Sequence, residues 1–139
     1  MANFVPDAVR NKVWSSAVDD LTAVTVKGMF IDHADDTPTV TDDFIDDILS
    51  AARVPAIASC PTLGSKTNGV VGVGIFDGAD MVFSALSGDA SESLILFNDT
   101  GTESTSDILV RWDTATGLPL TPNGADVTAQ WAAGGILAA

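Results

Sequence analysis

SLILFNDTGTESTSDILVRW, residues 93–112, contains two apolar runs separated by turn-forming residues. It opens on the apolar run Ser93–Asn98, passes through the turn formers Asp99–Gly101, and ends in a second run, Asp107–Trp112. In the second run every other residue is apolar, which is the period of a β-strand with one dry and one wet face. The pattern therefore predicts two antiparallel strands, with Arg111 on the wet face.

The same mixture of short apolar runs and turn residues continues on both sides of this stretch. Asn-Gly and Asp-Gly pairs tolerate positive φ, which tight hairpins require, and Asp77-Gly78 marks the clearest hairpin in the sequence. About seven to eight strands with turns every 8–12 residues predict a mainly β protein, an antiparallel β-sandwich or small barrel. The further strands that we expect are Thr22–Ile31, Ala56–Cys60, Gly69–Phe76, Ala79–Leu86, Asp126–Ala132 and a short Ile136–Leu137.

Helical patterns are confined to the N-terminal third, where we expect one or two short helices. Pro6 and Asp7 suit the first turn of a helix over Pro6–Ala17. Thr41 is a good N-cap for a second short helix, whose start is rich in Asp. In that second helix Asp46 and Asp47 should face water, and the residues expected to be buried are Phe44, Ile45, Ile48 and Leu49.

The length and the net charge of the chain limit the kinds of protein that it can be. The 139 residues suit a single domain, 1–139, in which residues 1–6 could form an N-terminal arm. The net charge of −13, with only six scattered basic residues, argues against direct binding to nucleic acid or to an anionic membrane. The N-terminus lacks a basic region and a long apolar run, so we expect no signal peptide. The lone Cys60 is expected to be a small buried hydrophobe.

One motif points to an enzyme. An apolar strand ending in Asp99-Thr100-Gly101 is similar to the catalytic loop of aspartic proteases, in which two such loops share a proton between two carboxylates. Asn98 stands where that family has an apolar residue, and a second strand that would brace the loop is not evident. A turn between two strands is the favoured interpretation, and we expect no catalytic residues and no enzymatic activity.

Metal and cofactor sites are also not expected. His33 is the only histidine, and its neighbours Asp32, Asp35 and Asp36 do not follow the spacing of a calcium loop. They are interpreted as a solvated acidic loop. The glycine-rich residues 69–78 lack the Lys-Ser/Thr of a phosphate-binding loop, so their glycines are expected to serve a curved sheet.

Candidate contact residues lie at the N-terminal arm and in one loop. An apolar arm can dock on a neighbouring subunit or pack on its own core. Trp112 and Trp131 could anchor a partner, but core packing is the favoured interpretation because they end the dry faces of strands. The residues that we predict at an interface are Phe4, Val5, Leu118, Pro119, Leu120 and Pro122.

Several motifs together resemble a family of small virion proteins encoded among the head and tail genes of tailed phages. The most specific of them is Gly117-Leu118-Pro119-Leu120-Thr121-Pro122-Asn123-Gly124. The others that carry the resemblance are Thr67-Asn68-Gly69, Phe76-Asp77-Gly78-Ala79-Asp80, Ser87-Gly88-Asp89-Ala90-Ser91-Glu92 and Asp99-Thr100-Gly101.

This resemblance implies a structural role in the particle. The expected protein is a minor capsid or decoration protein on the outside of the head, with a tail or connector component as the alternative. Its implied partners are the major capsid protein and copies of itself, a trimer being one arrangement. It would be made in the bacterial cytoplasm and located in the virion, without direct contact to nucleic acid or membrane.

Overall fold

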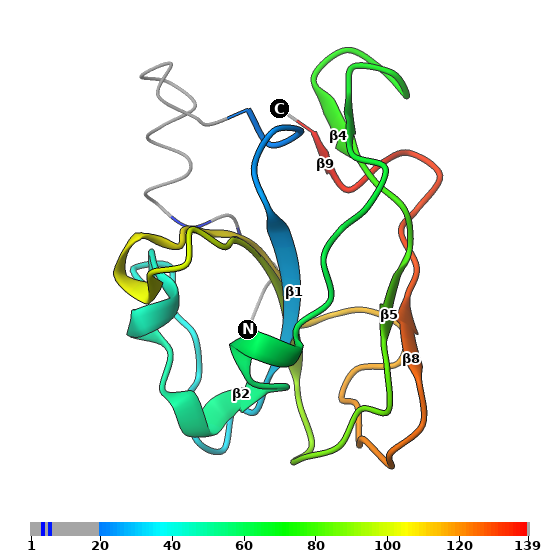
Figure 1. Ribbon diagram of the computed structural model, residues 1–139. Helices are drawn as coiled ribbons and strands as arrows, with labels where there is room; N and C mark the ends of the chain where they lie inside the picture. Colours follow the sequence, from blue (N-terminus) through cyan, green and yellow to red (C-terminus); the bar gives the residue numbers. More distant parts are fainter. Residues whose placement is uncertain (1–3, 5, 7–19, 139) are drawn as a thin grey trace.

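A computed structural model describes Phe4, Pro6 and residues 20–138 (Figure 1). The expected helix over Pro6–Ala17 and the candidate contact residue Val5 therefore lie outside the described residues. The described part contains nine short strands and four single turns of 3-10 helix, so the mainly β prediction is confirmed. The strands are β1 (Val26–Ile31), β2 (Arg53–Val54), β3 (Thr67–Asn68), β4 (Ile75–Asp77), β5 (Met81–Phe83), β6 (Ser93–Asn98), β7 (Ile108–Trp112), β8 (Val127–Ala129) and β9 (Leu137–Ala138).

The central sheet is antiparallel and has the strand order β2-β1-β6-β7. β6 and β7 are the two strands predicted from residues 93–112, and they pair with each other as expected. β6 also pairs with β1 along its whole length, from Ser93 opposite Ile31 to Asn98 opposite Val26. A bulge interrupts the β6–β7 pairing, since Leu96 faces Val110 whereas Phe97 faces Ile108. Such an extra residue locally shifts the alternation of side chains between the two faces.

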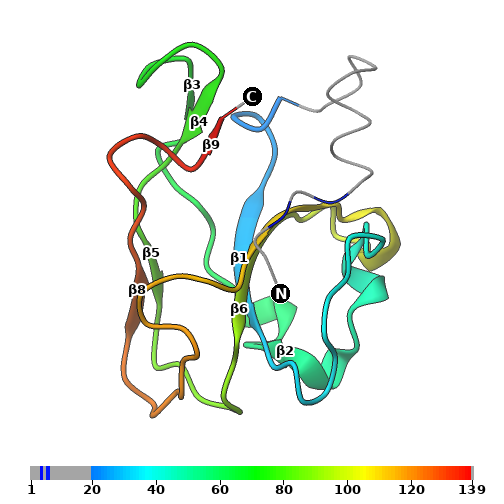
Figure 2. The same cartoon turned by 180° about the vertical axis from the view of Figure 1, so that it is seen from behind.

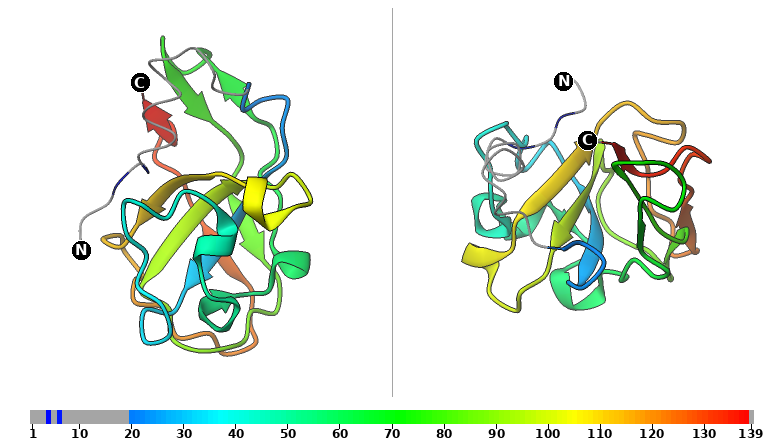
Figure 3. Two further views of the ribbon diagram at one scale, coloured as in Figure 1. Left: turned by 90° about the vertical axis from the view of Figure 1, so that its left-hand side faces the viewer. Right: turned by 90° about the horizontal axis from the view of Figure 1, so that it is seen from above.

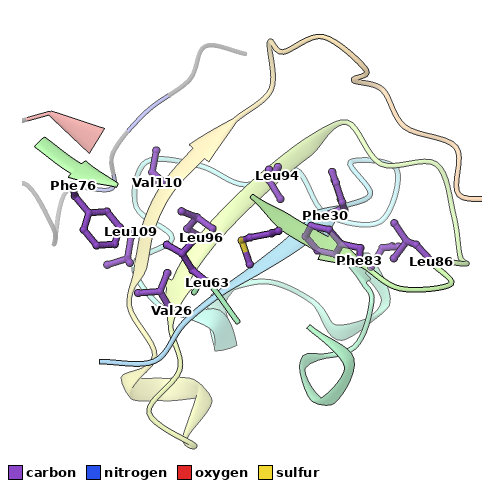
Figure 4. Packing of buried hydrophobic residues seen from close by; sticks show 12 residues of the cluster. Val26, Phe30, Leu63, Phe76, Phe83, Leu86, Leu94, Leu96, Leu109 and Val110 are labelled. Atoms are coloured by element: carbon purple, nitrogen blue, oxygen red, sulfur yellow. The ribbon is translucent and has the colours of Figure 1, made fainter. Parts of the chain in front are cut away.

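Both faces of this sheet are covered (Figure 3). On one face lies a cluster that includes Phe30, Leu94, Leu96 and Phe83 (Figure 4). On the other face a second cluster, with Ile95 and others from the sheet, packs against the 3-10 turns η1 (Ile45–Asp47) and η2 (Ser50–Ala52). Every residue of β6 is buried, as a strand in the middle of a doubly covered sheet should be.

The prediction that Arg111 faces water is wrong, because the second face is covered by the loop before η1. The Arg111 side chain is 0% exposed and its Nη1 donates to the Pro38 carbonyl, 3.3 Å away. Period-2 alternation locates the two faces of a strand, but it does not reveal whether a distant loop covers the polar one.

The first cluster is closed by two small sheets, β5-β8 and β3-β4-β9. Figures 1 and 2 show both on the same side of β1. The Phe83 ring of β5 lies 4.6 Å from the Phe30 ring of β1, which ties the layers together. Pairing between β5 and β8 joins residues more than forty positions apart, from Met81 opposite Ala129 to Phe83 opposite Val127.

The hairpin predicted at Asp77-Gly78 is wrong. β4 and β5 belong to different sheets, and the chain between them crosses from one to the other. Gly78 is required for close approach instead of a tight turn, because a Cβ at this position would lie 2.8 Å from the Leu63 side chain. β4 pairs with β9 and β5 pairs with β8, so each strand pairs with a segment that is distant in sequence instead of with the other.

Two of the predicted strands also need correction. Residues 69–74 form a loop between β3 and β4 instead of part of a strand, since Gly69 and Gly74 have positive φ. The strand predicted at Ala56–Cys60 is the 3-10 turn η3 (Ile57–Ser59). The remaining 3-10 turn, η4 (Glu103–Thr105), lies between β6 and β7.

The helix predicted after Thr41 is replaced by η1 and η2. Ile45 and Ile48 are buried as expected, but Leu49 is 60% exposed. The Arg53 side chain explains the early stop, because its Nη2 donates to the carbonyls of Ile45 and Ile48. Asp47 accepts from the backbone N–H groups of Asp43 and Phe44, so it caps the first turn and does not merely face water.

Candidate interaction surface

An open groove of about 590 Å³ lies beside the first cluster. The buried side chains of Phe30 and Leu94 contribute to its lining, together with residues 115–118 and 127–132. Trp112 and Trp131 line it too, with ring centroids 5.4 Å apart and the rings tilted by 40°. Trp131 is held in place because its Nε1 donates to the Ala79 carbonyl, 2.9 Å away. Apolar grooves of this size with fixed aromatic walls are typical binding sites.

The lining contains no charged side chain among the described residues. That is unusual for a chain in which 19 acidic residues oppose 6 basic ones. An apolar partner can enter such a groove without burying an unpaired charge. The sequence left two interpretations of Trp112 and Trp131, core packing and contact with a partner. Both fit the structure, because the two side chains pack against the first cluster and also line the groove.

The most exposed apolar segment is the loop between β3 and β4, which we call the valine tip, residues 69–74. Val73 is 100% exposed and Val70 is 76% exposed, while Val71 is exposed to a lesser degree. Figures 1 and 2 show this loop projecting from one end of the molecule. Sequence reasoning missed it, because valines at positions 70, 71 and 73 have high strand propensity. The signal that could have revealed it is the absence of any charge over residues 67–76.

The predicted contact residues in the loop before β8 divide between core and surface. Leu118 and Leu120 pack against the first cluster and line the groove. The backbone of Leu120 exchanges two hydrogen bonds of 2.8 Å with Ser91, which fixes this loop to the body of the protein. Pro119 is exposed, and Pro122 is half-buried. The loop therefore forms one wall of the groove instead of a free tip.

Phe4 packs on its own chain, which is the second of the two alternatives for the arm. Its N–H and carbonyl both bond to the Arg111 backbone, at 3.1 and 3.0 Å, so it extends the central sheet beyond β7. The Arg111 guanidinium carbon lies 4.6 Å from the Phe4 ring centroid, a cation–π contact. This bridge covers part of an otherwise open sheet edge.

The Asp99-Thr100-Gly101 loop is a turn held by internal contacts. The Oδ2 of Asp99 lies 2.6 Å from the Nζ of Lys27, and its Oδ1 accepts from the Gly101 N–H at 3.0 Å. Both contacts stabilise the charged carboxylate, and with the Lys27 hydrogen bond as the main cause they lower the pKa of Asp99. In a protease dyad two carboxylates share one proton, so one of them has a raised pKa. The contacts of Asp99 favour the turn interpretation.

Replacing Asp99 with asparagine should lower the free energy of unfolding at neutral pH by about 1 kcal/mol. Asparagine keeps an oxygen for the Gly101 N–H, so the change isolates the Lys27 ion pair. Since the folded-state pKa is depressed, the stabilisation is present above the unfolded pKa near 3.9 and is lost as the pH falls through the folded value. Urea denaturation of both proteins across this range should show the difference shrinking towards acid pH; a constant difference would contradict the ion-pair account.

The loop around His33 carries the remaining polar cluster. The carboxylates of Asp32, Asp35 and Asp89 approach one another closely, but Asp32 already accepts from the Ala34 N–H at 2.8 Å. The His33 ring lies 2.9 Å from the Ser93 hydroxyl, and burial is the main cause that lowers the pKa of His33. Asp32 is buried whereas Asp35 is exposed, so the interpretation as a solvated acidic loop is wrong for Asp32.

Cys60 is buried as predicted, and burial raises the pKa of its thiol to about 12. A thiol with that pKa is a poor nucleophile at neutral pH, because the thiolate is the reactive species.

Comparison with known proteins adds no relative. No protein-family model matches the sequence, and no curated protein is detectably similar to it. None of the helices in the described part of the chain has the length and apolar content needed to cross a bilayer.

Proposed function

We propose that this protein is a structural component of a tailed-phage virion, a minor capsid or decoration protein on the outside of the head. The observation that carries a binding role is the uncharged groove walled by Trp112 and Trp131 on a strongly acidic chain. Monomeric proteins rarely expose large apolar surfaces unless these bind something. The assignment to a phage particle is supported by the resemblance of residues 117–124 and the other motifs to small virion proteins.

An outer position fits the charge of the chain. With a net charge of −13, the protein would be repelled by the phosphates of packaged DNA. On the outside of the shell the same charge favours solubility of the finished particle. Repetition over a symmetric shell lets many weak contacts act together.

Purified particles provide the test. We expect the protein to co-purify with virions through a density gradient, and an antibody against it to label the outside of heads in electron micrographs. Label confined to tails would favour the tail or connector alternative. Particles of the encoding phage that lack the protein altogether would refute a virion role.

A further inference from the structure

We propose that the groove of one copy of this protein is filled by the valine tip of a second copy, so that the copies associate head to tail. The inference rests on the proposed assembly function and names the partner of its groove. It follows from the chemistry and placement of two surfaces on the same chain.

The valine tip is exposed to solvent, and the groove is open. Val73 is 100% exposed, so the tip does not occupy the groove of its own chain. Three valines held in water at the end of a projecting loop are costly unless a partner covers them. The groove, conversely, presents two tryptophan side chains and an apolar lining, and no segment of the described part of the chain fills it.

The tip and the groove are both uncharged. Residues 67–76 carry no charged side chain, and neither does the described lining of the groove. Because the chain has 19 acidic and only 6 basic residues, contacts between two copies elsewhere tend to bring like charges together, which repel. Contact between the tip and the groove is therefore a way for two copies of a protein with net charge −13 to meet without burying like charges.

The backbone of the tip has a preformed shape that hydrogen bonds within the loop hold in place. The Gly69 N–H donates to the Ile75 carbonyl at 2.9 Å, and the Ile75 N–H donates to the Gly72 carbonyl at 3.1 Å. Gly69 and Gly74 adopt the left-handed backbone that closes so tight a loop. A loop fixed in this way loses little conformational entropy on docking.

Because the tip and the groove are different surfaces, the contact is heterologous. Such contacts repeat from copy to copy and close into a ring where the rotation permits. Blocking the tip of one copy leaves its groove intact, and blocking a groove leaves the tip intact. This asymmetry makes the proposal testable by complementation.

The experiment uses sedimentation of the full chain at micromolar concentration. Wild-type protein should form oligomers. Val73→Asp, which places a carboxylate at the tip, and Ala115→Glu, which places one in the groove, should each be monomeric, with the dissociation constant raised about a hundredfold because an unpaired charge is costly to bury. Both positions are exposed in the single chain, so each variant should keep the wild-type melting temperature. An equimolar mixture of the two variants should form a dimer, through the one intact tip and the one intact groove.

Val40→Asp and Ala58→Glu are the matched controls. Val40 is 42% exposed and Ala58 is exposed, and neither lines the groove or belongs to the tip. Both controls should associate as the wild type does.

Three results would overturn the proposal: monomeric wild-type protein, wild-type association by Val73→Asp, or no dimer in the mixture. If the wild-type chain is monomeric but present in purified virions, the inference fails and the proposed function stands. If the chain self-associates as described but is absent from virions, the proposed function fails instead.

Discussion

Replacement of Arg111 by alanine is expected to lower the free energy of unfolding by about 3–5 kcal/mol, the usual cost of removing one partner from a buried ion pair. The Arg111 Nη2 lies 2.7 Å from the Oδ2 of Asp113, and both side chains are almost completely buried. Burial lowers the pKa of Arg111 and Asp113 raises it again, so the guanidinium stays charged. In the alanine variant the Asp113 carboxylate stays buried but loses its ion pair with Arg111.

The loss should spread beyond the ion pair. Arg111 also donates to the Pro38 carbonyl and lies over the Phe4 ring, so the variant weakens the attachment of the covering loop and of the arm. Urea denaturation followed by circular dichroism measures the change. The control is the double variant Arg111→Met with Asp113→Leu, which removes both charges and should recover most of the lost stability. A single variant that loses less than about 1 kcal/mol would show that the pair contributes little.

Phe83→Ala should cost a similar amount, about 3–5 kcal/mol, because it leaves a cavity between two layers of the fold. The Phe83 ring is 1% exposed, lies 4.6 Å from the Phe30 ring and approaches Gly28 of β1 closely. Glycine at position 28 leaves room for the ring, since a Cβ there would lie 3.1 Å from Phe83. Aromatic pairs of this kind contribute more than their buried area alone.

Val82 provides the matched control for this variant. It is the neighbour of Phe83 on β5, but it points away from the core and is 47% exposed. Val82→Ala should change the free energy of unfolding by about 0.5 kcal/mol or less. Equal losses from the two variants, measured by thermal or urea denaturation, would mean that β5 does not pack on the central sheet as described.

Some strands are predicted from the sequence more accurately than others, for physical reasons. Ser93–Asn98 was predicted with the bounds that the structure shows, because six consecutive strand-forming or buried residues leave no competing structure. Gly69–Phe76 and Ala56–Cys60 also contain residues of high strand propensity. Glycines with positive φ make a loop of most of the first segment, and hydrogen bonds between residues i and i+3 make a 3-10 turn of the second. Propensity is a weak guide where strands are two or three residues long.

The candidate site was harder to predict than the fold. Trp112, Trp131, Leu118 and Leu120 were recognised as notable, yet their meeting around one groove depends on chain segments that are distant in sequence. The absence of charge over residues 67–76 marks the valine tip in the sequence, but the exposure of its side chains is seen only in the structure. Phe4 was recognised as a contact residue, but the sequence left open whether its partner is its own chain or another, and hydrogen bonds to Arg111 decide in favour of its own.

The sequence alone predicts correctly that the protein is mainly antiparallel β, that residues 93–98 and 107–112 form paired strands, that Cys60 is buried and that the chain is strongly acidic. These properties follow from local alternation, turn chemistry and charge, which need no knowledge of distant partners. The packed structure was needed to show that both faces of the central sheet are covered, that Arg111 is buried, that β4 and β5 lie in different sheets and that an uncharged groove exists. Each of these depends on which remote segments cover a given side chain, and burial is a property of the whole packed chain instead of any one stretch of it.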